Sequence, residues 1–539
     1  MPLLKFCVKF CAPALFAVLA ANPALAATCE SLASLQLPHT TITAAQSISA
    51  GTYTAPDGEV FQDMPAFCRV AATLTPTADS DIGIEIWMPS STWNKRFEGV
   101  GNGGYAGAVP YAAIAPEVQL GYSTVGTDTG HTSSSTYDAS FALGHPVKII
   151  DFGYRSIHLM TVIGKEISSA FYSEDSHNSY FTGCSTGGRQ ALMEAQRFPD
   201  DYDGIVAGDP VAYYTHHHVG ANLWVVWQMF DNPDSTVFTT QDALLGNAVD
   251  AACDALDGVV DGVLNNPRQC HFDPAALKCS GSEMPPACLT SKQVEAVRHL
   301  WGGPDRMVQQ KGFYPPFERG GEGDGWPATI SPQPPPAQQT DDHALIGLPF
   351  FEYFVFDDPN WDFRTFDWIS GPAYVDNKVV VPGQTLSTVL NSINPDLKRF
   401  RARGGKLIQY HGFSDPEVPP LTSINYFESV VASSLQSPNA IEQPSPQTDD
   451  EVQAFYRLFM VPGMNHCKGG PGANVFDMLT PLTHWVERGV APDRVLATHY
   501  KNNQQDQGVA FTRPLCPYPQ EAAYKGKGNP DRAANFVCK

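Results

Sequence analysis

The sequence is poor in basic residues and in long apolar runs. Lysine and arginine number 34 against 56 aspartate and glutamate residues, and the formal net charge is −22 at pH 7. Nucleic-acid phosphates require a basic surface, and anionic lipid headgroups attract the same sign of charge. No stretch beyond residue 26 reaches the roughly 18 apolar residues of a membrane-spanning helix. We therefore expect neither a nucleic-acid partner nor a membrane span.

The first residues have the pattern of a secretory signal peptide. Lys5 and Lys9 provide a positive start, residues 10–21 are apolar, and residues 24–26 form a small-x-small cleavage site. The alternative, a membrane anchor, requires a longer apolar run. We predict that residues 1–26 are a signal peptide and that the mature protein is secreted or periplasmic.

Twelve cysteines are present, of which Cys7 and Cys11 lie in the predicted signal peptide. The others are even in number, and in an oxidising compartment they predict five disulfides. Closeness in the sequence suggests the pairs Cys253–Cys270, Cys279–Cys288 and Cys516–Cys538, and Cys29 and Cys68, both near the expected mature N-terminus, could form a fourth. Cys184 and Cys467 are then left, far apart in the chain. Other connectivities remain open on this count alone.

Strand and helix patterns alternate along much of the chain. Residues 81–88 alternate in polarity, and residues 151–171 have an apolar helical face. Further strands are predicted at 97–100, 180–182, 205–207, 406–410 and 456–461, and helices at 189–198 and 476–487. Such alternation predicts an α/β fold, with a mostly parallel sheet and helices on both faces.

The middle of the chain breaks this alternation. It contains four cysteines, a proline-rich run at 331–339 and many aromatic residues at 349–368. Core-type strands resume afterwards, which favours a large inserted lid over an independent downstream domain. We predict that residues 27–210 and 371–539 form the core and that residues 211–370 form the lid.

The stretch YFTGCSTGGRQ places Ser185 in a G-x-S-x-G pattern between a strand and a helix. This context is typical of the nucleophile elbow of an α/β-hydrolase, in which the serine Oγ projects above the sheet. The amide of Thr186 would then face a developing oxyanion. A glycine-rich turn without catalytic function is the alternative.

A second oxyanion amide is expected from an early loop at the end of a strand. GNGGYAG follows the strand at 97–100, and Gly103 or Gly104 would present a bare backbone amide there. An ordinary glycine turn is again the alternative.

An α/β-hydrolase core orders its catalytic residues as serine, acid and histidine. Asp415 follows the strand at 406–410 and is the candidate acid, with Glu417 as a nearby rival. A turn before a proline is the structural alternative for Asp415. His466 follows the last strand in a glycine-rich loop and is the candidate base.

Cys184 directly precedes Ser185, and Cys467 directly follows His466. A disulfide between them would force the two catalytic candidates together, because disulfide-linked Cα atoms lie about 4.4–6.8 Å apart. The rival interpretation is a free catalytic thiol at Cys184.

An acidic loop, CDALDGVVDGV, lies in the expected lid. Asp254, Asp257 and Asp261 recur within it, and Val259 and Val263 could add carbonyl oxygens. Carboxylates and carbonyls are the ligands that Ca²⁺ prefers. The spacing does not match an EF-hand, so on chemistry alone a solvated acidic turn is an equal alternative.

Two other groups of polar residues are given structural roles. Histidines 216–218 lack an acidic or cysteine partner at zinc-ligand spacing, and we expect them on a surface at the lid hinge. Asp128 and His131 precede the nucleophile, against the expected order, and are predicted to be structural.

These motifs resemble those of the tannase and feruloyl esterase family of α/β-hydrolases. The likeness is carried by GCSTGGRQALMEAQRFPDDYDGIVAGDP, HGFSDPEV, GMNHC, CDALDGVVDGV and DPNWDFRTFD, which together span most of the mature chain. The resemblance implies a disulfide-tied triad at Cys184, Ser185, Asp415, His466 and Cys467. It also implies a structural Ca²⁺ held by Asp254, Asp257, Asp261 and the carbonyls of Val259 and Val263, and no organic cofactor.

The resemblance further implies a serine carboxylesterase acting on esters of small aromatic acids, such as those of plant cell walls or polyphenols. Feruloyl or hydroxycinnamoyl esters are the first choice; galloyl esters and mono(2-hydroxyethyl) terephthalate are the alternatives. A terephthalate enzyme is expected to hold the free carboxylate with a lid arginine, and Arg364 is the only basic residue in the aromatic segment. A peptidase and a non-catalytic binding protein on the same fold are the rival classes, and the complete triad argues against the second.

Overall fold

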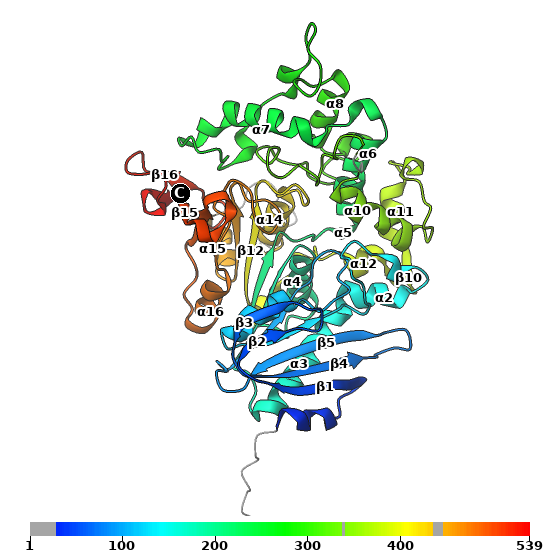
Figure 1. Cartoon of the computed structure of the whole chain (residues 1–539), viewed down its shortest axis with the longest axis vertical. Helices are drawn as coiled ribbons and strands as arrows, with labels where there is room; N and C mark the ends of the chain where they lie inside the picture. Colours follow the sequence, from blue (N-terminus) through cyan, green and yellow to red (C-terminus); the bar gives the residue numbers. More distant parts are fainter. Residues whose placement is uncertain (1–27, 337–339, 435–445) are drawn as a thin grey trace, which may run out of the picture.

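The computed structural model of the protein describes residues 28–336, 340–434 and 446–539, so the predicted signal peptide lies outside the described residues. A nine-stranded sheet forms its centre (Figure 1), in the order β1-β4-β5-β7-β6-β8-β9-β12-β13. The strands are β1 (Thr40–Ile48), β4 (Phe67–Leu74), β5 (Ile82–Pro89), β6 (Arg96–Val100), β7 (Ser123–Thr127), β8 (Asn178–Cys184), β9 (Gly204–Gly208), β12 (Lys406–Gly412) and β13 (Tyr456–Val461).

The sheet is parallel from β7 through to β13, and β1, β4 and β5 add an antiparallel edge. The core helices are α1 (Tyr111–Gln119), α3 (Ser156–Tyr172), α4 (Thr186–Arg197), α14 (Leu421–Ser434) and α16 (Leu479–Arg488). Apolar side chains of α3, α4 and α14 share one core with the sheet, whereas α1 and α16 contribute to two separate clusters of buried residues. The predicted α/β fold with a mostly parallel sheet is confirmed.

The predicted elements are present, with shifted ends. Helix α4 begins at Thr186, three residues before the predicted start, and α16 begins at Leu479 instead of residue 476. Asp477, one residue before the N-cap Met478, accepts the amide of Thr480 at 3.0 Å and so satisfies a free amide of the first turn at this later start. Within the central sheet, strands β1, β4 and β7 have no counterpart among the predicted strands. All five residues of β7 are buried, so it has no alternation to detect.

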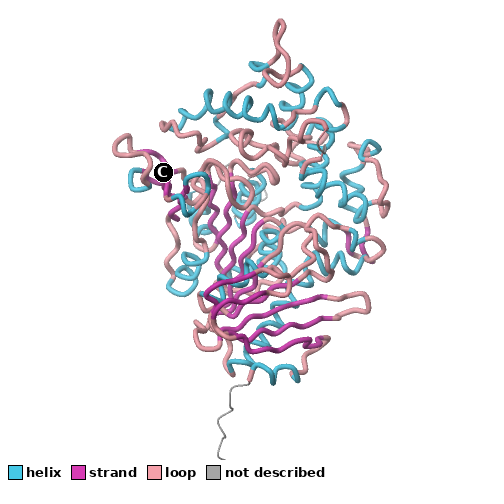
Figure 2. The backbone as a smooth tube through the Cα atoms, viewed as in Figure 1, coloured by secondary structure: helices cyan, strands magenta, loops and turns pink. Residues whose placement is uncertain are grey.

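Between β9 and β12 the described chain adds no strand to the sheet (Figures 1 and 2). It forms instead α5 (Tyr214–His217), α6 (Trp224–Phe230), α7 (Thr239–Cys253), α8 (Ser291–Leu300), α9 (Asp305–Val308), α10 (Asp342–Pro349), α11 (Gly371–Asn377), α12 (Leu386–Leu390), α13 (Lys398–Ala402) and the hairpin β10 (Val379–Val381) with β11 (Gln384–Thr385). Apolar residues of this region share a core with Tyr105 and Phe152. The division into core and lid remains our interpretation of this arrangement.

Smaller elements complete the molecule. They are the hairpins β2 (Gly51–Thr54) with β3 (Val60–Met64), β14 (Val495–Tyr500) with β15 (Val509–Leu515) and β16 (Ala522–Tyr524) with β17 (Phe536–Cys538), and the helices α2 (Pro146–Ile150) and α15 (Pro446–Gln453). No helix in the described ranges is both long and apolar enough to cross a bilayer.

Candidate active site

Ser185 stands at the junction between strand β8 and helix α4. Its backbone has φ 63° and ψ −123°, a positive-φ conformation that is rare for a residue with a side chain and marks a strained turn. Gly183 and Gly187 let strand and helix touch, because a Cβ on Gly183 would lie 2.6 Å from the carbonyl carbon of Gly187. The sequence therefore folds here as a strand, a sharp turn and a helix, the form of a nucleophile elbow.

His466 and Asp415 form a hydrogen-bonded pair. His466 Nδ1 lies 2.7 Å from Asp415 Oδ2. Asp415 Oδ1 accepts the amides of Glu417 and Val418 at 2.8 and 2.9 Å, and these bonds fix the carboxylate. Glu417, the rival acid, lies on the other side of the ring, with its carboxylate 3.6 Å from His466 Nε2. Asp415 is therefore placed to orient the imidazole.

A disulfide joins Cys184 to Cys467, with their Cα atoms 6.0 Å apart. It holds the neighbouring backbones of Ser185 and His466 together and leaves no free thiol at Cys184. Among the described residues, His466 Nε2 is buried and has no hydrogen-bond partner. The structure also contains the other disulfides that the sequence suggests: Cys29–Cys68, Cys253–Cys270, Cys279–Cys288 and Cys516–Cys538.

Two buried residues that the sequence reasoning missed support this pair. Asp209, directly after β9, accepts the amide of Gly412 at 2.7 Å and that of Cys467 at 3.2 Å. His411, in β12, places Nε2 3.2 Å from Asp415 Oδ2. The only sequence signal for Asp209 was its position after a buried strand in GIVAGDP.

Opposite charges act on the pKa values of these groups. Burial acts to raise the pKa of Asp415, but attraction to His466 and hydrogen bonds from His411 and His466 hold it below its ordinary value. Burial acts to lower the pKa of His466, yet the negative charges of Asp415 and Glu417 raise it. Burial raises the pKa of Asp209 to about 6, against the attraction of His411. The site therefore stabilises an imidazolium at His466, the species that a base forms when it accepts a proton.

The GNGGYAG loop lies against the start of α4. Thr186 Oγ1 donates a hydrogen bond to the carbonyl of Gly104 at 2.7 Å. Within the described chain, the amides of Gly103 and Gly104 donate no backbone hydrogen bond. A Cβ on Gly104, which has φ 52°, would lie 2.4 Å from Thr136 O, whereas Gly103 faces open space. Both glycine amides lie in a loop that contacts the helix after Ser185.

A cavity opens beside Ser185, lined on its apolar side by Val211, Tyr214, Ile346 and Val418. Its polar lining consists of Thr186, Tyr137, Asp342, Glu417, His217, His218, Asn222 and His343. Among the residues that the structure describes, no lysine or arginine lines it. Arg364 lies elsewhere, half exposed, and donates to Phe230 O at 3.0 Å.

Comparison with known proteins identifies the family. A model of the family described as tannase and feruloyl esterase matches residues 68–539. The chain belongs to this family.

Relatives and solved structures agree with that assignment. An uncharacterized esterase of Xanthomonas campestris is 40% identical over 95% of this chain and 91% of its own. Feruloyl esterase C of Talaromyces stipitatus is 32% identical over 93% of this chain and 92% of its own. The crystal structure of feruloyl esterase B from Aspergillus oryzae has a TM-score of 0.81 at 28% identity, over 95% of this chain and 99% of that one. This member of the family is a carboxylic ester hydrolase with the α/β-hydrolase architecture.

The three consecutive histidines of this esterase are buried, so the expected hinge surface is wrong. His216 Nε2 lies 2.9 Å from Asp376 Oδ2, His217 Nδ1 lies 3.1 Å from Tyr314 Oη, and the His218 ring stacks on Phe350 at 4.1 Å. Consecutive residues of a helical turn point about 100° apart, so each ring meets a different partner. Aromatic side chains from later in the chain cover them, which the local sequence does not reveal.

Asp128 and His131 lie away from the cavity lining. Asp128 Oδ1 accepts the amides of Gly83 and Gly130 at 2.9 and 2.8 Å. His131 stacks on Phe141 at 3.7 Å between ring centroids. These contacts agree with the structural roles predicted for both residues.

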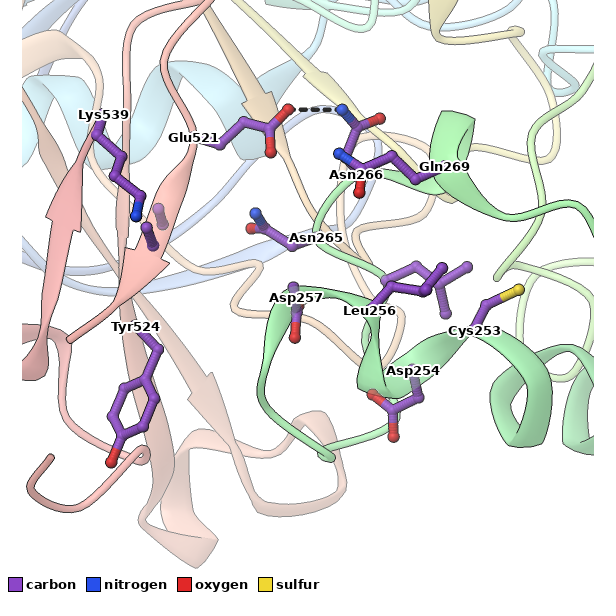
Figure 3. A pocket seen from close by; sticks show the side chains of 13 residues that line it. Cys253, Asp254, Leu256, Asp257, Asn265, Asn266, Gln269, Glu521, Tyr524 and Lys539 are labelled. Carbon is purple, nitrogen blue, oxygen red and sulfur yellow. Dashed lines mark hydrogen bonds between the residues drawn. The ribbon is translucent and has the colours of Figure 1, made fainter. Parts of the chain in front are cut away.

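The acidic loop of this esterase forms one side of a small cavity. Asp257, Val259, Asp261 and Val263 line that side, and Arg513, Phe511 and other residues from outside the loop line the rest of its roughly 30 Å³. Asp254 and Asp257 also line a neighbouring pocket with Glu521 (Figure 3). Burial and then the charges of Asp261 and Asp254 raise the pKa of Asp257 to about 6, against a hydrogen bond from Val259 N.

The carboxylates of this loop already have protein partners. Asp254 accepts the amides of Asp261 and Gly262 at 3.2 and 3.0 Å, and Asp261 forms an ion pair with Arg513. Among the described residues the three carboxylates do not converge within 4.8 Å of one another. Carboxylate and carbonyl oxygens are the ligands that Ca²⁺ prefers, but an ion here would have to draw the three carboxylates together and replace these hydrogen bonds.

Proposed function

We propose that this protein is a secreted or periplasmic serine carboxylesterase that hydrolyses esters of small aromatic acids, with feruloyl or hydroxycinnamoyl esters as its first substrates. The observation that carries the proposal is the disulfide between Cys184 and Cys467, which links the elbow of Ser185 to the hydrogen-bonded pair His466–Asp415. Five disulfides support an oxidising compartment, in line with the predicted signal peptide.

The proposed reaction is acyl transfer through a covalent intermediate. His466 Nε2 removes the proton of Ser185 Oγ, which attacks the ester carbonyl carbon and forms a tetrahedral intermediate. Asp415 holds the imidazole in the tautomer with hydrogen on Nδ1 and stabilises its protonated form. His466 then protonates the leaving alcohol as the C–O bond breaks. Water, deprotonated by His466, releases the aromatic acid from Ser185 by the same steps.

The oxyanion of each tetrahedral intermediate would accept hydrogen bonds from two backbone amides. The first is that of Thr186, at the positive end of α4. The second comes from Gly103 or Gly104, whose loop is fixed to Thr186 by the hydrogen bond between Thr186 Oγ1 and Gly104 O.

The cavity beside Ser185 favours a substrate without negative charge. Asp342 and Glu417 are acidic, and the described part of the chain places no lysine or arginine in the lining. Arg364 is engaged elsewhere. A terephthalate monoester would bring a carboxylate into this surrounding without a counter-charge. The names of two relatives, both feruloyl esterases, support the phenolic acid. A galloyl ester, the substrate class of a tannase, is the second candidate, because it is also phenolic and uncharged.

We propose in addition that Asp254, Asp257, Asp261 and the carbonyls of Val259 and Val263 hold a structural Ca²⁺. The donor types support this assignment, because carboxylate and carbonyl oxygens are the ligands that Ca²⁺ prefers. The ion would stabilise the loop that the Cys253–Cys270 disulfide closes and would take no part in the chemistry.

A panel of esters tests the substrate class. We expect methyl ferulate and methyl 4-hydroxycinnamate to be hydrolysed with higher kcat/KM than methyl gallate, and a terephthalate monoester to be the poorest. A terephthalate monoester as the best substrate would overturn the class. Peptide hydrolysis faster than ester hydrolysis would favour the peptidase.

A further inference from the structure

His218 belongs to the wall of the cavity beside Ser185, yet the proposed reaction does not use it. Its side chain is only 1% exposed, its ring stacks on Phe350 at 4.1 Å, and it meets the edge of Tyr214 at 4.6 Å. In the described part of the chain, its Nε2 is buried and makes no hydrogen bond. A buried polar atom without a partner is unfavourable. Both ring nitrogens of His131 also lack a partner among the described residues, so it is the place of His218 in the cavity lining that indicates a ligand group to complete the bond.

A series of hydrogen bonds determines which nitrogen of His218 carries a hydrogen. The series runs from the carbonyl group of Pro416 through His343 and Asn222 to His218. His343 Nε2 lies 2.8 Å from the carbonyl oxygen of Pro416. A carbonyl only accepts hydrogen bonds, so His343 Nε2 carries a hydrogen. Burial lowers the pKa of His343 to about 4, so the ring is neutral and its Nδ1 has a lone pair.

The side-chain amide of Asn222 lies between His343 Nδ1 and His218 Nδ1, so the protonation of the first ring decides that of the second. Asn222 Oδ1 lies 2.7 Å from His343 Nδ1, and Asn222 Nδ2 lies 2.9 Å from His218 Nδ1. The two ends of an amide have nearly the same shape, so the hydrogen-bond network decides which end is nitrogen. Because His343 Nδ1 needs a donor, we assign the two ends the other way round, with the NH₂ group facing His343 and the oxygen facing His218.

The Asn222 oxygen accepts a hydrogen bond, so His218 Nδ1 must carry a hydrogen. Burial lowers the pKa of His218 well below its ordinary value, and the ring is therefore neutral. A neutral imidazole with hydrogen on Nδ1 has its lone pair on Nε2. The unpartnered atom is therefore a hydrogen-bond acceptor.

We propose that His218 Nε2 accepts a hydrogen bond from a hydroxyl group on the aromatic ring of the acyl part of the substrate, and so selects phenolic acids. This inference rests on the proposed function. A phenolic hydroxyl supplies the missing donor, whereas a methoxy group in the same place has no hydrogen to donate. A carboxylate would be repelled, because its oxygens and His218 Nε2 are all acceptors. The stacked aromatic surroundings of His218 suit a flat ring, and Asp342 and Glu417 add no positive charge that would favour an anion.

Three matched esters test the inference on the purified enzyme: methyl 4-hydroxycinnamate, methyl 4-methoxycinnamate and methyl cinnamate. For the unmodified enzyme we expect kcat/KM on the hydroxylated ester to exceed the other two by about tenfold to a hundredfold, because a buried acceptor left without a donor is costly. His218→Phe keeps a ring that can stack but has no hydrogen-bond acceptor. We expect this variant to lose the preference for the hydroxylated ester, mainly because its kcat/KM on that ester falls. His218→Gln keeps an acceptor and is expected to restore part of this preference.

His131→Phe is the matched control, because it also replaces a buried, stacked histidine but lies away from the cavity lining. It should keep the full preference. Equal kcat/KM of the unmodified enzyme on the hydroxylated and methoxylated esters would overturn the inference, whether or not any variant folds. An undiminished preference in a folded His218→Phe variant would overturn the assignment to His218. Failure to hydrolyse all three esters would instead refute the proposed function on which the inference rests.

Discussion

Asp415 and Glu417 lie two residues apart and face opposite nitrogens of the same imidazole. Asp415 Oδ2 lies 2.7 Å from His466 Nδ1, and Glu417 Oε2 lies 3.6 Å from His466 Nε2. Both carboxylates favour a positive charge on the ring, but only Asp415 is placed to orient it. Asp415 therefore sets the tautomer of the base, and both acids raise the pKa of His466 against the effect of burial.

The first prediction concerns the pH dependence of hydrolysis. Burial lowers the pKa of His466, but Asp415 and Glu417 raise it above the ordinary 6.5. The base acts when neutral, so kcat/KM on an uncharged ester is expected to fall as the pH drops, with a midpoint above pH 6.5. Glu417→Gln removes one raising charge and should move this midpoint to lower pH. Glu428→Gln, an exposed carboxylate on α14, is the control that should leave it in place; a midpoint below 6.5 would contradict this account.

The second prediction concerns the central disulfide. We expect Cys184→Ala/Cys467→Ala to lose both stability, by about 2–5 kcal/mol, and most of its turnover at temperatures where it remains folded. Cys516→Ala/Cys538→Ala removes a disulfide near the C-terminus and should lose stability alone. The measurements are thermal unfolding and kcat on methyl ferulate. Unchanged kcat in the first double variant would show that the disulfide does not position Ser185 against His466.

The third prediction concerns Asp209, which ties the amides of Gly412 and Cys467 to the end of β9. Asp209→Asn replaces one acceptor with a donor, so one of these buried bonds is lost. We expect kcat to fall about tenfold to a hundredfold, equivalent to about 1–3 kcal/mol, with little change in KM. Asp203→Asn is the matched control at the opposite end of β9, where the carboxylate accepts Ser179 N at 2.8 Å. Equal effects of the two variants on kcat would assign Asp209 a structural role only.

The fourth prediction concerns calcium. Mass spectrometry of the dialysed protein under native conditions should find about one Ca²⁺ per chain, and a chelator should lower the melting temperature. Asp257→Asn should lower the amount of bound Ca²⁺ and reduce the effect of the chelator on the melting temperature, because it removes a carboxylate that lines the small cavity. Asp273 is an exposed carboxylate paired with Arg298, and Asp273→Asn should change neither the bound Ca²⁺ nor the effect of the chelator. Protein without metal, and with unchanged melting after chelation, would eliminate the site.

The sequence predicted those parts of the site that depend on local pattern. The elbow at Ser185 and the acid and base positions follow from strand, turn and helix signals, and the central disulfide follows from two leftover cysteines. Asp209 and His411 could not be found in this way, because their roles depend on β9 and β12 being neighbours in the sheet.

The buried environment of His216, His217 and His218 could not be read locally either. The aromatic cover over His218 includes Phe350, which lies 132 positions later by the numbering of the chain. Strand β7 was missed for a related reason, because a strand buried on both faces has no period to detect. Local patterns therefore predicted the placement of Asp415 beside His466, and the disulfide between Cys184 and Cys467, better than the surroundings of the cavity.

The most direct test of the central claim is turnover of methyl ferulate by Ser185→Ala, compared with Ser429→Ala, a helix serine on α14 whose Oγ donates to Tyr426 O. Circular dichroism and thermal unfolding establish that both variants are folded. We predict that Ser185→Ala loses all hydrolysis above background while Ser429→Ala retains it. Turnover by the folded Ser185→Ala variant at a rate near that of the unmodified enzyme would contradict the proposed mechanism.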